Sequence, residues 1–311
     1  QVEYASLICK YLPKSLNSVY FTTGGSESIE GAMKLAKRAT GRSKIVAFRN
    51  AYHGSTQGSL SLMSDESFKQ AFRPLIPGVI HLDYNTSDLS LIDKGVAAVF
   101  VEPIQGEAGV VEPTNDFLKK LRNRCNEVGA LLVFDEIQTG FGRTGKLFAF
   151  EHYEIVPDIL CAAKGMGGGL PIGAFIADIK LMQSLSNNPI LGHINTFGGN
   201  AVCVEAARAA LDVIINDNLI NRAVEIESYF KANLKHSKIK QLRIKGALGA
   251  IEFENTEQAF KVCKKLIEAG IVTDWFLFNS NSLRISPPLV ITDEELKSAV
   301  IDIIKVLDGN P

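Results

Sequence analysis

Short apolar runs alternate with helical patterns through the first two thirds of this chain, and this alternation constrains the fold more than any other feature. The runs are rich in β-branched residues and have the length of strands. They are KIVAF (44–48), AAVFVE (97–102), ALLVFDE (130–136) and DILCAA (158–163). A helical pattern at 28–40 precedes the first run and another at 115–129 separates the second from the third. Gly41 and Gly129 stand where helices commonly end. The alternation predicts an α/β protein whose mostly parallel sheet has helices on both faces.

The pattern changes after a long helix predicted at 200–217. The remaining residues alternate helices with short strands, and Thr292 followed by Glu295 predicts a capping box at the start of a final helix. We therefore expect residues 1–217 to form a large domain and residues 218–311 to form a smaller α+β domain.

Composition excludes several classes of partner. The chain has 311 residues and a formal net charge of −1, so it lacks the basic surface expected of a protein that binds nucleic acid or anionic membranes. No apolar run approaches the roughly 18 residues that a membrane span needs. The five cysteines are scattered and never spaced as C-x-x-C, which favours reduced thiols in a cytoplasmic protein and predicts no metal site.

Residues 130–148, ALLVFDEIQTGFGRTGKLF, contain two glycine patterns found in nucleotide-binding loops. GFGRTG has the spacing of a dinucleotide loop, but Asp135, Glu136 and Gln138 separate it from the strand that such a loop follows directly. GFGRTGK has the spacing of a P-loop, but Leu147 follows its lysine where magnesium binding requires serine or threonine. Both interpretations are disfavoured, although a P-loop NTPase stays open as an alternative function.

Three predicted strands end at charged residues, Glu102, Asp135 and Lys164. In a parallel α/β sheet, ligands bind outside the carboxyl ends of the strands. A lysine directly after an apolar strand is expensive to bury unless it is paired or covalently used. Pyridoxal phosphate (PLP) requires a lysine for its Schiff base and an acidic partner for its pyridine nitrogen, so these strand ends indicate a PLP site.

The phosphate of such a cofactor needs a cradle, and residues 21–36, FTTGGSESIEGAMKLA, supply one. A strand end and a glycine pair lead there into a helix. The free N–H groups and the positive potential of a helix N-terminus favour a phosphate dianion.

Six motifs, in this order along the chain, together resemble the class III PLP-dependent aminotransferases of the acetylornithine, ornithine and 4-aminobutyrate type. They are FTTGGSESIEGAMKLAKRATG, AYHGST, VEPIQGEAGVV, LLVFDEIQTGFGRTGKLFAFE, PDILCAAKGMGGGLPIGA and HINTFGGNAV. The resemblance implies a fold type I enzyme with a large and a small domain, working as a homodimer with active sites shared across the interface. It also implies that an N-terminal segment of the family is absent from this chain.

The resemblance implies that five residues contact the cofactor ring. Lys164 would form the Schiff base and later carry the proton between substrate and cofactor. Asp135 would keep the pyridine nitrogen protonated, and Gln138 would donate to the 3-oxygen of the ring. Ile137 and Tyr52 would pack on its two faces.

Further family positions surround the ring. Gly25 and Ser26 correspond to the phosphate-binding residues, and Thr196 corresponds to the threonine that reaches the phosphate of the neighbouring subunit. His53 and Glu102 correspond to residues that support the cofactor.

Two residues would recognise substrates. Arg284 corresponds to the arginine that binds the carboxylate of the 2-oxo acid, by the bidentate geometry that a guanidinium favours. Glu107 corresponds to the acid that pairs with this arginine when an ω-amine substrate occupies the site. Ser55 stands where many relatives have an arginine that binds a substrate carboxylate.

The function implied by the resemblance is transamination from an ω-amino acid or an N-acylornithine, such as acetylornithine, to a 2-oxo acid such as 2-oxoglutarate, with ping-pong kinetics. Two alternatives on the same fold are an aminomutase and a decarboxylase of dialkylated amino acids.

Overall fold

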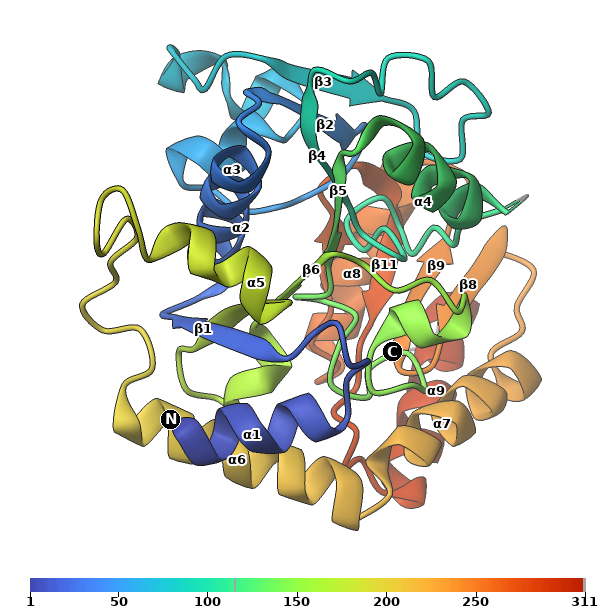
Figure 1. Cartoon of the computed structure of the whole chain (residues 1–311). Coiled ribbons are helices and arrows are strands. Elements are labelled where there is room, and N and C mark those ends of the chain that lie inside the picture. The colour runs from blue at the N-terminus through green and yellow to red at the C-terminus, as the bar shows by residue number, and fades with distance from the viewer. Residues whose placement is uncertain (115, 310–311) are drawn as a thin grey trace. The chain divides into compact units, whose positions relative to one another are not determined.

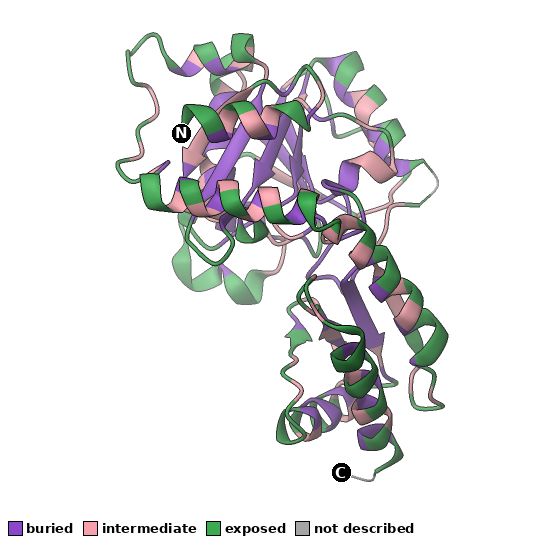
Figure 2. Cartoon of the chain, turned by 90° about the horizontal axis from the view of Figure 1, so that it is seen from below, coloured by how far each residue is buried: buried purple, intermediate pink, exposed green. Residues whose placement is uncertain are grey.

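The structure is a computed structural model that describes residues 1–114 and 116–309, and Figure 1 shows its elements. These residues form two compact units. The first comprises residues 1–103, 113–140 and 149–213, and the second comprises residues 104–112, 141–148 and 214–311. Each unit has its own sheet, and Figure 2 shows buried residues concentrated along the strands of both sheets.

The first unit contains a seven-stranded sheet. In spatial order its strands are β1 (Ser18–Thr22), β7 (Gly173–Ala177), β6 (Ile159–Ala162), β5 (Leu131–Asp135), β4 (Val96–Val101), β2 (Lys44–Phe48) and β3 (Val79–Leu82). Only β7 runs against its neighbours, and the other described strands of this sheet are parallel to one another. The carboxyl ends of β1, β2, β4, β5 and β6 therefore meet at one edge of the sheet.

Helices cover both faces of this sheet, with α2 and α4 on opposite sides of the strands in Figure 1. The α-helices of this unit are α1 (Val2–Lys10), α2 (Gly25–Thr40), α3 (Gln57–Ser61), α4 (Phe117–Val128), α5 (Ile179–Met182) and α6 (Ala201–Asn216), which ends just inside the second unit. Ala47 packs in one cluster with the apolar face of α2. Its neighbour Phe48 points to the other face, because successive strand residues alternate, and meets Phe117 of α4 with ring centroids 5.3 Å apart.

The second unit contains a four-stranded antiparallel sheet. Its spatial order is β10 (Trp275–Phe276), β11 (Asn279–Ile285), β9 (Leu248–Glu252) and β8 (Gln241–Lys245), and its helices are α7 (Leu219–Asn233), α8 (Thr256–Glu268) and α9 (Asp293–Asp308). Apolar residues of these three helices and of β8, β9 and β11 form one core. The predicted capping box opens α9, where Thr292 and Glu295 bond each other's backbone N–H groups.

The predicted fold class is confirmed. The strand predicted at 44–48 has the observed bounds, and the other three predicted strands of the large sheet end within one residue of the observed ones. The prediction missed β3 and β7, which lie beside Gly78 and begin at Gly173, and it located only the end of β1, before the glycine pair of the cradle. Gly41 and Gly129 end α2 and α4 in the left-handed conformation, as predicted. The division of the chain into domains at 1–217 and 218–311 stays a proposal.

No helix within the described ranges has both the length and the apolar composition that crossing a bilayer requires.

Candidate active site

The three charged strand ends predicted from sequence lie at the same edge of the large sheet. Glu102 follows β4 directly, Asp135 is the last residue of β5, and Lys164 comes two residues after β6. Asp135 pairs in register with Cys161 of β6, so the acid and the lysine belong to adjacent strand ends. The parallel direction of β4, β5 and β6 brings these residues together, since in an antiparallel pair every second end would lie at the far edge.

Asp135 is buried, with 4% of its surface exposed, and a defined partner holds each of its oxygens. Oδ1 accepts a hydrogen bond of 3.0 Å from the N–H of Ile137, and Oδ2 accepts one of 2.7 Å from Nδ1 of His53. A carboxylate oxygen has two lone pairs, so each oxygen retains capacity for a further donor. A pyridinium N–H is a donor of the kind this carboxylate can still accept.

His53 supports the charge of Asp135 from within the core. Its burial lowers its pKa, but the hydrogen bond and charge of Asp135, with a contribution from Glu102, outweigh burial and raise the pKa above its ordinary value. Its Nε2 is buried and has no hydrogen-bond partner among the residues that the structure describes. Phe100 packs beside the ring with its centroid 6.3 Å away. The hydrogen bond from His53 thereby fixes the orientation of the Asp135 carboxylate.

Lys164 has a backbone conformation that is uncommon for a residue with a side chain. Its φ is +48°, in the left-handed region, where Cβ crowds the backbone. It opens a short 3₁₀-helix, Lys164–Gly167, and Gly168 and Gly169 continue the chain with positive φ. Unlike the apolar residues of β6, Lys164 is exposed in this chain. Backbone strain of this kind concentrates at functional sites.

The N-terminus of α2 forms the predicted cradle. Gly24 precedes the helix in an extended conformation and no side chain caps it, which leaves N–H groups of the first turn open to a ligand. A Cβ at Gly25 would lie 3.0 Å from Cδ1 of Ile137, so the helix approaches the segment that follows Asp135. Ser28 ties the helix to β6, with Oγ 3.3 Å from the carbonyl of Ala162. The cradle is thus held beside the strand that leads to Lys164.

The AYHGST loop is attached to both elements. The N–H of Tyr52 donates to Oε1 of Glu102 at 2.8 Å, and the N–H of Ser55 donates to Oγ of Ser26 at 3.3 Å. A Cβ at Gly54 would lie 2.3 Å from the same Ser26 oxygen, so the loop lies directly against the cradle. Ser55, the departure from the family pattern, is exposed.

Glu30 was not identified from the sequence, yet it holds this loop to α2. Its Oε1 accepts from Thr56 Oγ1 at 2.6 Å and from the N–H groups of Gly58 and Ser59 at 2.8 and 3.1 Å. These donors belong to the start of α3, which has no side-chain cap of its own. The only sequence signal was its position on the same helical face as the cradle, one turn after Ser26.

Glu136 was also missed, and it explains the glycine-rich segment. It is completely buried and accepts from Oγ1 of Thr139 and from the N–H groups of Ala149 and Phe150 at 2.9 and 2.7 Å. Burial raises its pKa to about 7, although these donors act in the opposite direction. The carboxyl group therefore closes residues 137–148 into a loop whose two ends meet at the end of β5.

Neither nucleotide-loop interpretation finds support in this geometry. Lys146 is exposed, and the described residues after it form only the 3₁₀-helix Ala149–His152 before β6. A P-loop needs its lysine at the start of an α-helix, where N–H groups surround the phosphates.

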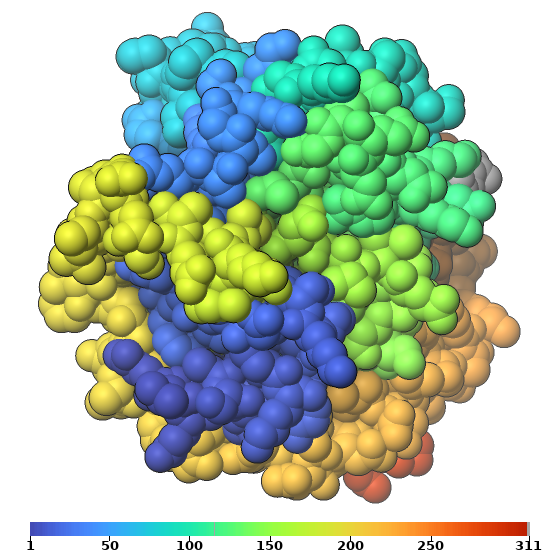
Figure 3. Space-filling view, in the orientation of Figure 1, coloured from blue at the N-terminus to red at the C-terminus, as the bar shows by residue number. Residues whose placement is uncertain are grey.

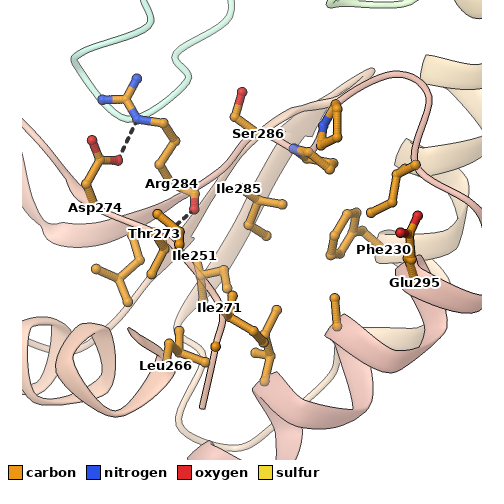
Figure 4. Close-up of a pocket in the computed structure, with 18 residues that line it drawn as sticks. Phe230, Ile251, Leu266, Ile271, Thr273, Asp274, Arg284, Ile285, Ser286 and Glu295 are labelled. Atoms are coloured by element: carbon orange, nitrogen blue, oxygen red, sulfur yellow. Dashed lines mark hydrogen bonds and ion pairs between the residues drawn. The ribbon is translucent and has the colours of Figure 1, made fainter. Parts of the chain in front are cut away.

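The two predicted substrate residues contact each other in the second unit. Nη2 of Arg284 lies 3.0 Å from both carboxylate oxygens of Glu107, and its Nε donates to Asp274 at 2.9 Å. The guanidinium carbon lies 4.7 Å from the ring centre of Phe276. Figure 4 shows Arg284 and Asp274 at one end of a pocket in this unit whose other walls are largely apolar. Asp274 was not identified from the sequence.

Gln138 is half-buried and lies three residues after Asp135, and Thr196 is exposed on the loop that precedes α6. The neighbour of Thr196, Asn195, donates to Glu27 of the first turn of α2 at 2.7 Å. This hydrogen bond links the Thr196 loop to the cradle.

Together, the fold and these strand ends define an α/β protein that can hold a phosphate-bearing ring between an acidic and a basic side chain. The residues fit PLP, since the cradle is uncapped, Asp135 retains acceptor capacity and Lys164 is accessible. The model of the family described as "Aminotransferase class-III" matches residues 1–307, and the chain belongs to this family. It is a PLP-dependent aminotransferase.

Three similar proteins are also aminotransferases or transaminases. The chain is 40% identical to a putrescine aminotransferase of Pectobacterium atrosepticum, over 98% of this chain and 69% of that protein. It is 38% identical to an acetylornithine aminotransferase of Methanopyrus kandleri, over 99% of this chain and 79% of that protein. A [LysW]-aminoadipate semialdehyde/glutamate semialdehyde transaminase of Sulfolobus acidocaldarius is 39% identical, over 96% of this chain and 76% of that protein.

Solved structures give the same result. The ornithine aminotransferase of Toxoplasma gondii is 33% identical and superposes with a TM-score of 0.89, over 99% of this chain and 75% of that one. A transaminase of the marine bacterium Virgibacillus is 27% identical with a TM-score of 0.91, over 99% of this chain and 78% of that one.

Proposed function

We propose that this aminotransferase moves the amino group of an ω-amino acid or an N-acylornithine to a 2-oxo acid such as 2-oxoglutarate, in two half-reactions that use one site in turn. The names of the relatives support this class of donor, since putrescine and acetylornithine both carry a primary amine at the end of a carbon chain. No observation favours the aminomutase or decarboxylase alternatives.

Bound PLP supplies a ring that accepts electrons from the substrate carbon. We assign the basic role to Lys164, whose amine anchors the cofactor and afterwards accepts and returns the proton at that carbon. Asp135 holds a proton on the ring nitrogen, with His53 fixing its carboxylate by the 2.7 Å hydrogen bond. Gln138 donates to the ring 3-oxygen.

We assign the remaining cofactor contacts to six further residues. Ile137 and Tyr52 bound the two faces of the ring, and Glu102 holds the backbone of Tyr52. Gly25 and Ser26 bind the phosphate through the first turn of α2. Thr196 binds the phosphate of the partner subunit.

The Glu107–Arg284 pair carries the substrate proposal. Arg284 is half-buried and has two counter-charges, Asp274 on Nε and Glu107 through two contacts of 3.0 Å to Nη2. When the acceptor is a 2-oxo acid, its carboxylate takes the place of Glu107 on the guanidinium. When the donor presents only an amine, Glu107 returns to the guanidinium. One arginine thereby serves two substrates of different charge.

We further propose a cytoplasmic homodimer with shared active sites and with domains at 1–217 and 218–311. Apolar side chains exposed in this chain support the dimer. They gather in the segment before α6, where Ile190, Leu191, Ile194 and Phe197 are 80%, 68%, 69% and 70% exposed. Figure 3 shows this segment in yellow at the molecular surface. A patch of this kind marks an interaction site.

The test is a screen of amino donors with the purified enzyme and either 2-oxoglutarate or pyruvate. The panel contains N-acetylornithine, N-succinylornithine, ornithine, 4-aminobutyrate and β-alanine. Turnover with at least one of these donors is the expected result. No turnover with any of them by a protein that carries PLP would refute the proposed substrate class.

Arg284→Gln separates the two half-reactions. We expect the KM for 2-oxoglutarate to rise about tenfold to a hundredfold, because a charge-assisted hydrogen bond to the acceptor is lost. The rate of the donor half-reaction in single turnover should change much less. Arg222→Gln is the matched control, because Arg222 also bonds two carboxylates in the second unit, those of Glu225 and Asp293. Equal losses in both half-reactions would contradict the assigned role.

A further inference from the structure

One carboxylate connects the two elements assigned to cofactor phosphates. Oε2 of Glu27, in the first turn of α2, accepts from the N–H of Thr23 at 2.8 Å, from Oγ1 of Thr23, and from Nδ2 of Asn195 at 2.7 Å. Thr23 leads directly into the cradle at Gly24 and Gly25. A single oxygen therefore collects donors from the cradle and from a loop about 170 residues further along the chain.

Asn195 in turn shapes the loop that presents Thr196. Its Oδ1 accepts from the N–H groups of Phe197 and Gly198 at 3.2 and 2.8 Å, which closes a turn around Thr196. A Cβ at Gly198 would lie 2.4 Å from the carbonyl oxygen of Phe21 in β1, so the turn packs directly on the strand that precedes the cradle. The position of Thr196 thus depends on Asn195, and the orientation of Asn195 depends on Glu27.

The charge of Glu27 needs an explanation, because it lies in the helix turn that binds a phosphate dianion. Two like charges in one helix turn disfavour each other. Burial also opposes the charge, but the hydrogen bonds from Thr23 and Asn195 outweigh it and hold the pKa of Glu27 below its ordinary value. The acid would weaken phosphate binding unless its hydrogen bonds contribute more to the site than its charge costs.

We propose that Glu27 is a positioning residue that fixes both the phosphate cradle of its own subunit and the Thr196 turn offered to the partner subunit. Retention of PLP in each of the two sites then depends on both copies of this carboxylate. The effect of Glu27 on the partner's site rests on the proposed homodimer and on the proposed role of Thr196. Its effect on the cradle of its own subunit does not.

The test compares Glu27→Gln, Asn195→Ala and the double variant in the full-length holoenzyme. We measure the rate at which PLP leaves the protein and the rise in Tm that PLP produces over the apo form. Each single variant should lose PLP about tenfold faster, as expected for loss of a hydrogen bond to a charged group. The double variant should lose PLP more slowly than the product of the two single effects predicts, because both changes break the shared Glu27–Asn195 hydrogen bond.

The PLP-induced rise in Tm distinguishes positioning from a general structural role. A structural role would lower the Tm of apo and holo forms equally and leave the rise unchanged, and this result would overturn the proposal. So would PLP loss at the wild-type rate in Glu27→Gln or Asn195→Ala, or effects that multiply in the double variant. Glu225→Gln is the control, since it removes an exposed carboxylate bonded to Arg222 in the second unit.

Thr196→Ala separates this inference from the function it rests on. We expect faster PLP loss, with no further acceleration when it is combined with Asn195→Ala. PLP retention at the wild-type rate in Thr196→Ala, with faster loss in Glu27→Gln, would refute the contact with the partner's phosphate while supporting Glu27 as the residue that fixes its own cradle. If Glu27→Gln fails to fold, Asn195→Ala alone carries the test, because its side chain lies in a surface loop.

Discussion

Asp135 and Glu136 are adjacent acids with different tasks, and their environments explain the difference. Asp135 ends β5 and accepts a hydrogen bond of 2.7 Å from His53, whose pKa is raised. Glu136 meets only neutral donors in a fully buried position, and its pKa rises to about 7. The sequence DE gives no sign of this difference, since successive side chains point in different directions and only the packed core supplies their partners.

Lys164→Ala should abolish turnover while leaving PLP bound through its phosphate and ring contacts. We expect kcat to fall by about 10⁴-fold or more, because a positioned acid–base group alone contributes about 10²- to 10⁴-fold. Borohydride reduction followed by peptide mass spectrometry should attach the cofactor to Lys164 in the wild type and to no lysine in the variant.

Lys146→Ala is the matched control for this experiment, because Lys146 is an exposed lysine of the disfavoured P-loop pattern. It should keep normal turnover and normal labelling at Lys164. An adduct at another lysine of the wild-type protein would contradict the assignment.

The contribution of His53 to stability should depend on pH. Its pKa is raised in the folded protein, so this contribution is complete below its ordinary pKa of 6.5 and is lost as the pH rises through the folded-state pKa. His53→Asn keeps a donor but cannot hold a charge. Urea unfolding of the apo forms should show a difference between wild type and variant that is largest near pH 6 and smaller near pH 8, roughly one to two units above the ordinary pKa.

Comparison with the variant is needed because Glu136 also makes the folding stability fall as the pH rises. Its pKa is raised from 4.5 to about 7, so its folded form also loses stability as the pH rises between these values. His81→Asn is a control of opposite sign, since burial lowers the pKa of His81. A difference for His53→Asn that does not vary with pH would refute its role.

At the scale of elements, α2 organises the site. Its first turn forms the cradle, Glu27 and Glu30 attach two loops to it, and its apolar face packs on β6 and β7. Gly31 permits this packing, because a Cβ there would lie 2.2 Å from Cε1 of Phe175 in β7. Close approach of this helix to the sheet brings the cradle to the end of β6.

Gly31→Ala should destabilise the protein even though alanine favours helices. The gain in helix propensity is about 1 kcal/mol. Overpacking against a buried ring costs about 1–3 kcal/mol, and the ring of Phe175 has no room to move because it is completely buried. A contact of 2.2 Å puts the cost in the upper part of this range, about 2–3 kcal/mol. After the propensity gain, we expect the free energy of unfolding to fall by about 1–2 kcal/mol, measured by urea denaturation.

The double variant Gly31→Ala/Phe175→Leu tests the cause. The smaller side chain relieves the contact, so the double variant should lose less stability than the sum of the two single losses. Additive losses would show that the contact with Phe175 is not responsible.

At the scale of the whole molecule, contacts between residues far apart in sequence decide which segments belong to the same compact unit. Residues 104–112 and 141–148 form part of the second unit, although both lie between strands of the first. Sequence patterns describe neighbours along the chain, so no local pattern indicates this membership. The first of these segments carries Glu107, and its bond to Arg284 joins positions 177 residues apart.

The proposed homodimer predicts that charge in the exposed apolar segment will separate the subunits. Ile190→Glu and Leu191→Glu should raise the monomer fraction in light scattering after size exclusion, because the charge must be desolvated on association. The variants should also lose PLP faster, because Thr196 of the partner is withdrawn. Ile267→Glu, at a 53% exposed position on α8, is the control. A fully dimeric Leu191→Glu with normal PLP retention would contradict the proposed interface.

The sequence by itself determined the α/β class, the PLP-dependent aminotransferase family and the strand ends where Glu102, Asp135 and Lys164 stand. These follow from periodicity and from the rule that parallel strands end at one edge, both of which are local or topological properties. Only the tertiary structure decided which acid meets His53, how Glu136 closes its loop, and that Glu27 joins the cradle to Asn195. These contacts depend on burial and on partners from distant segments, and no local pattern encodes the geometry that brings such partners within hydrogen-bonding distance.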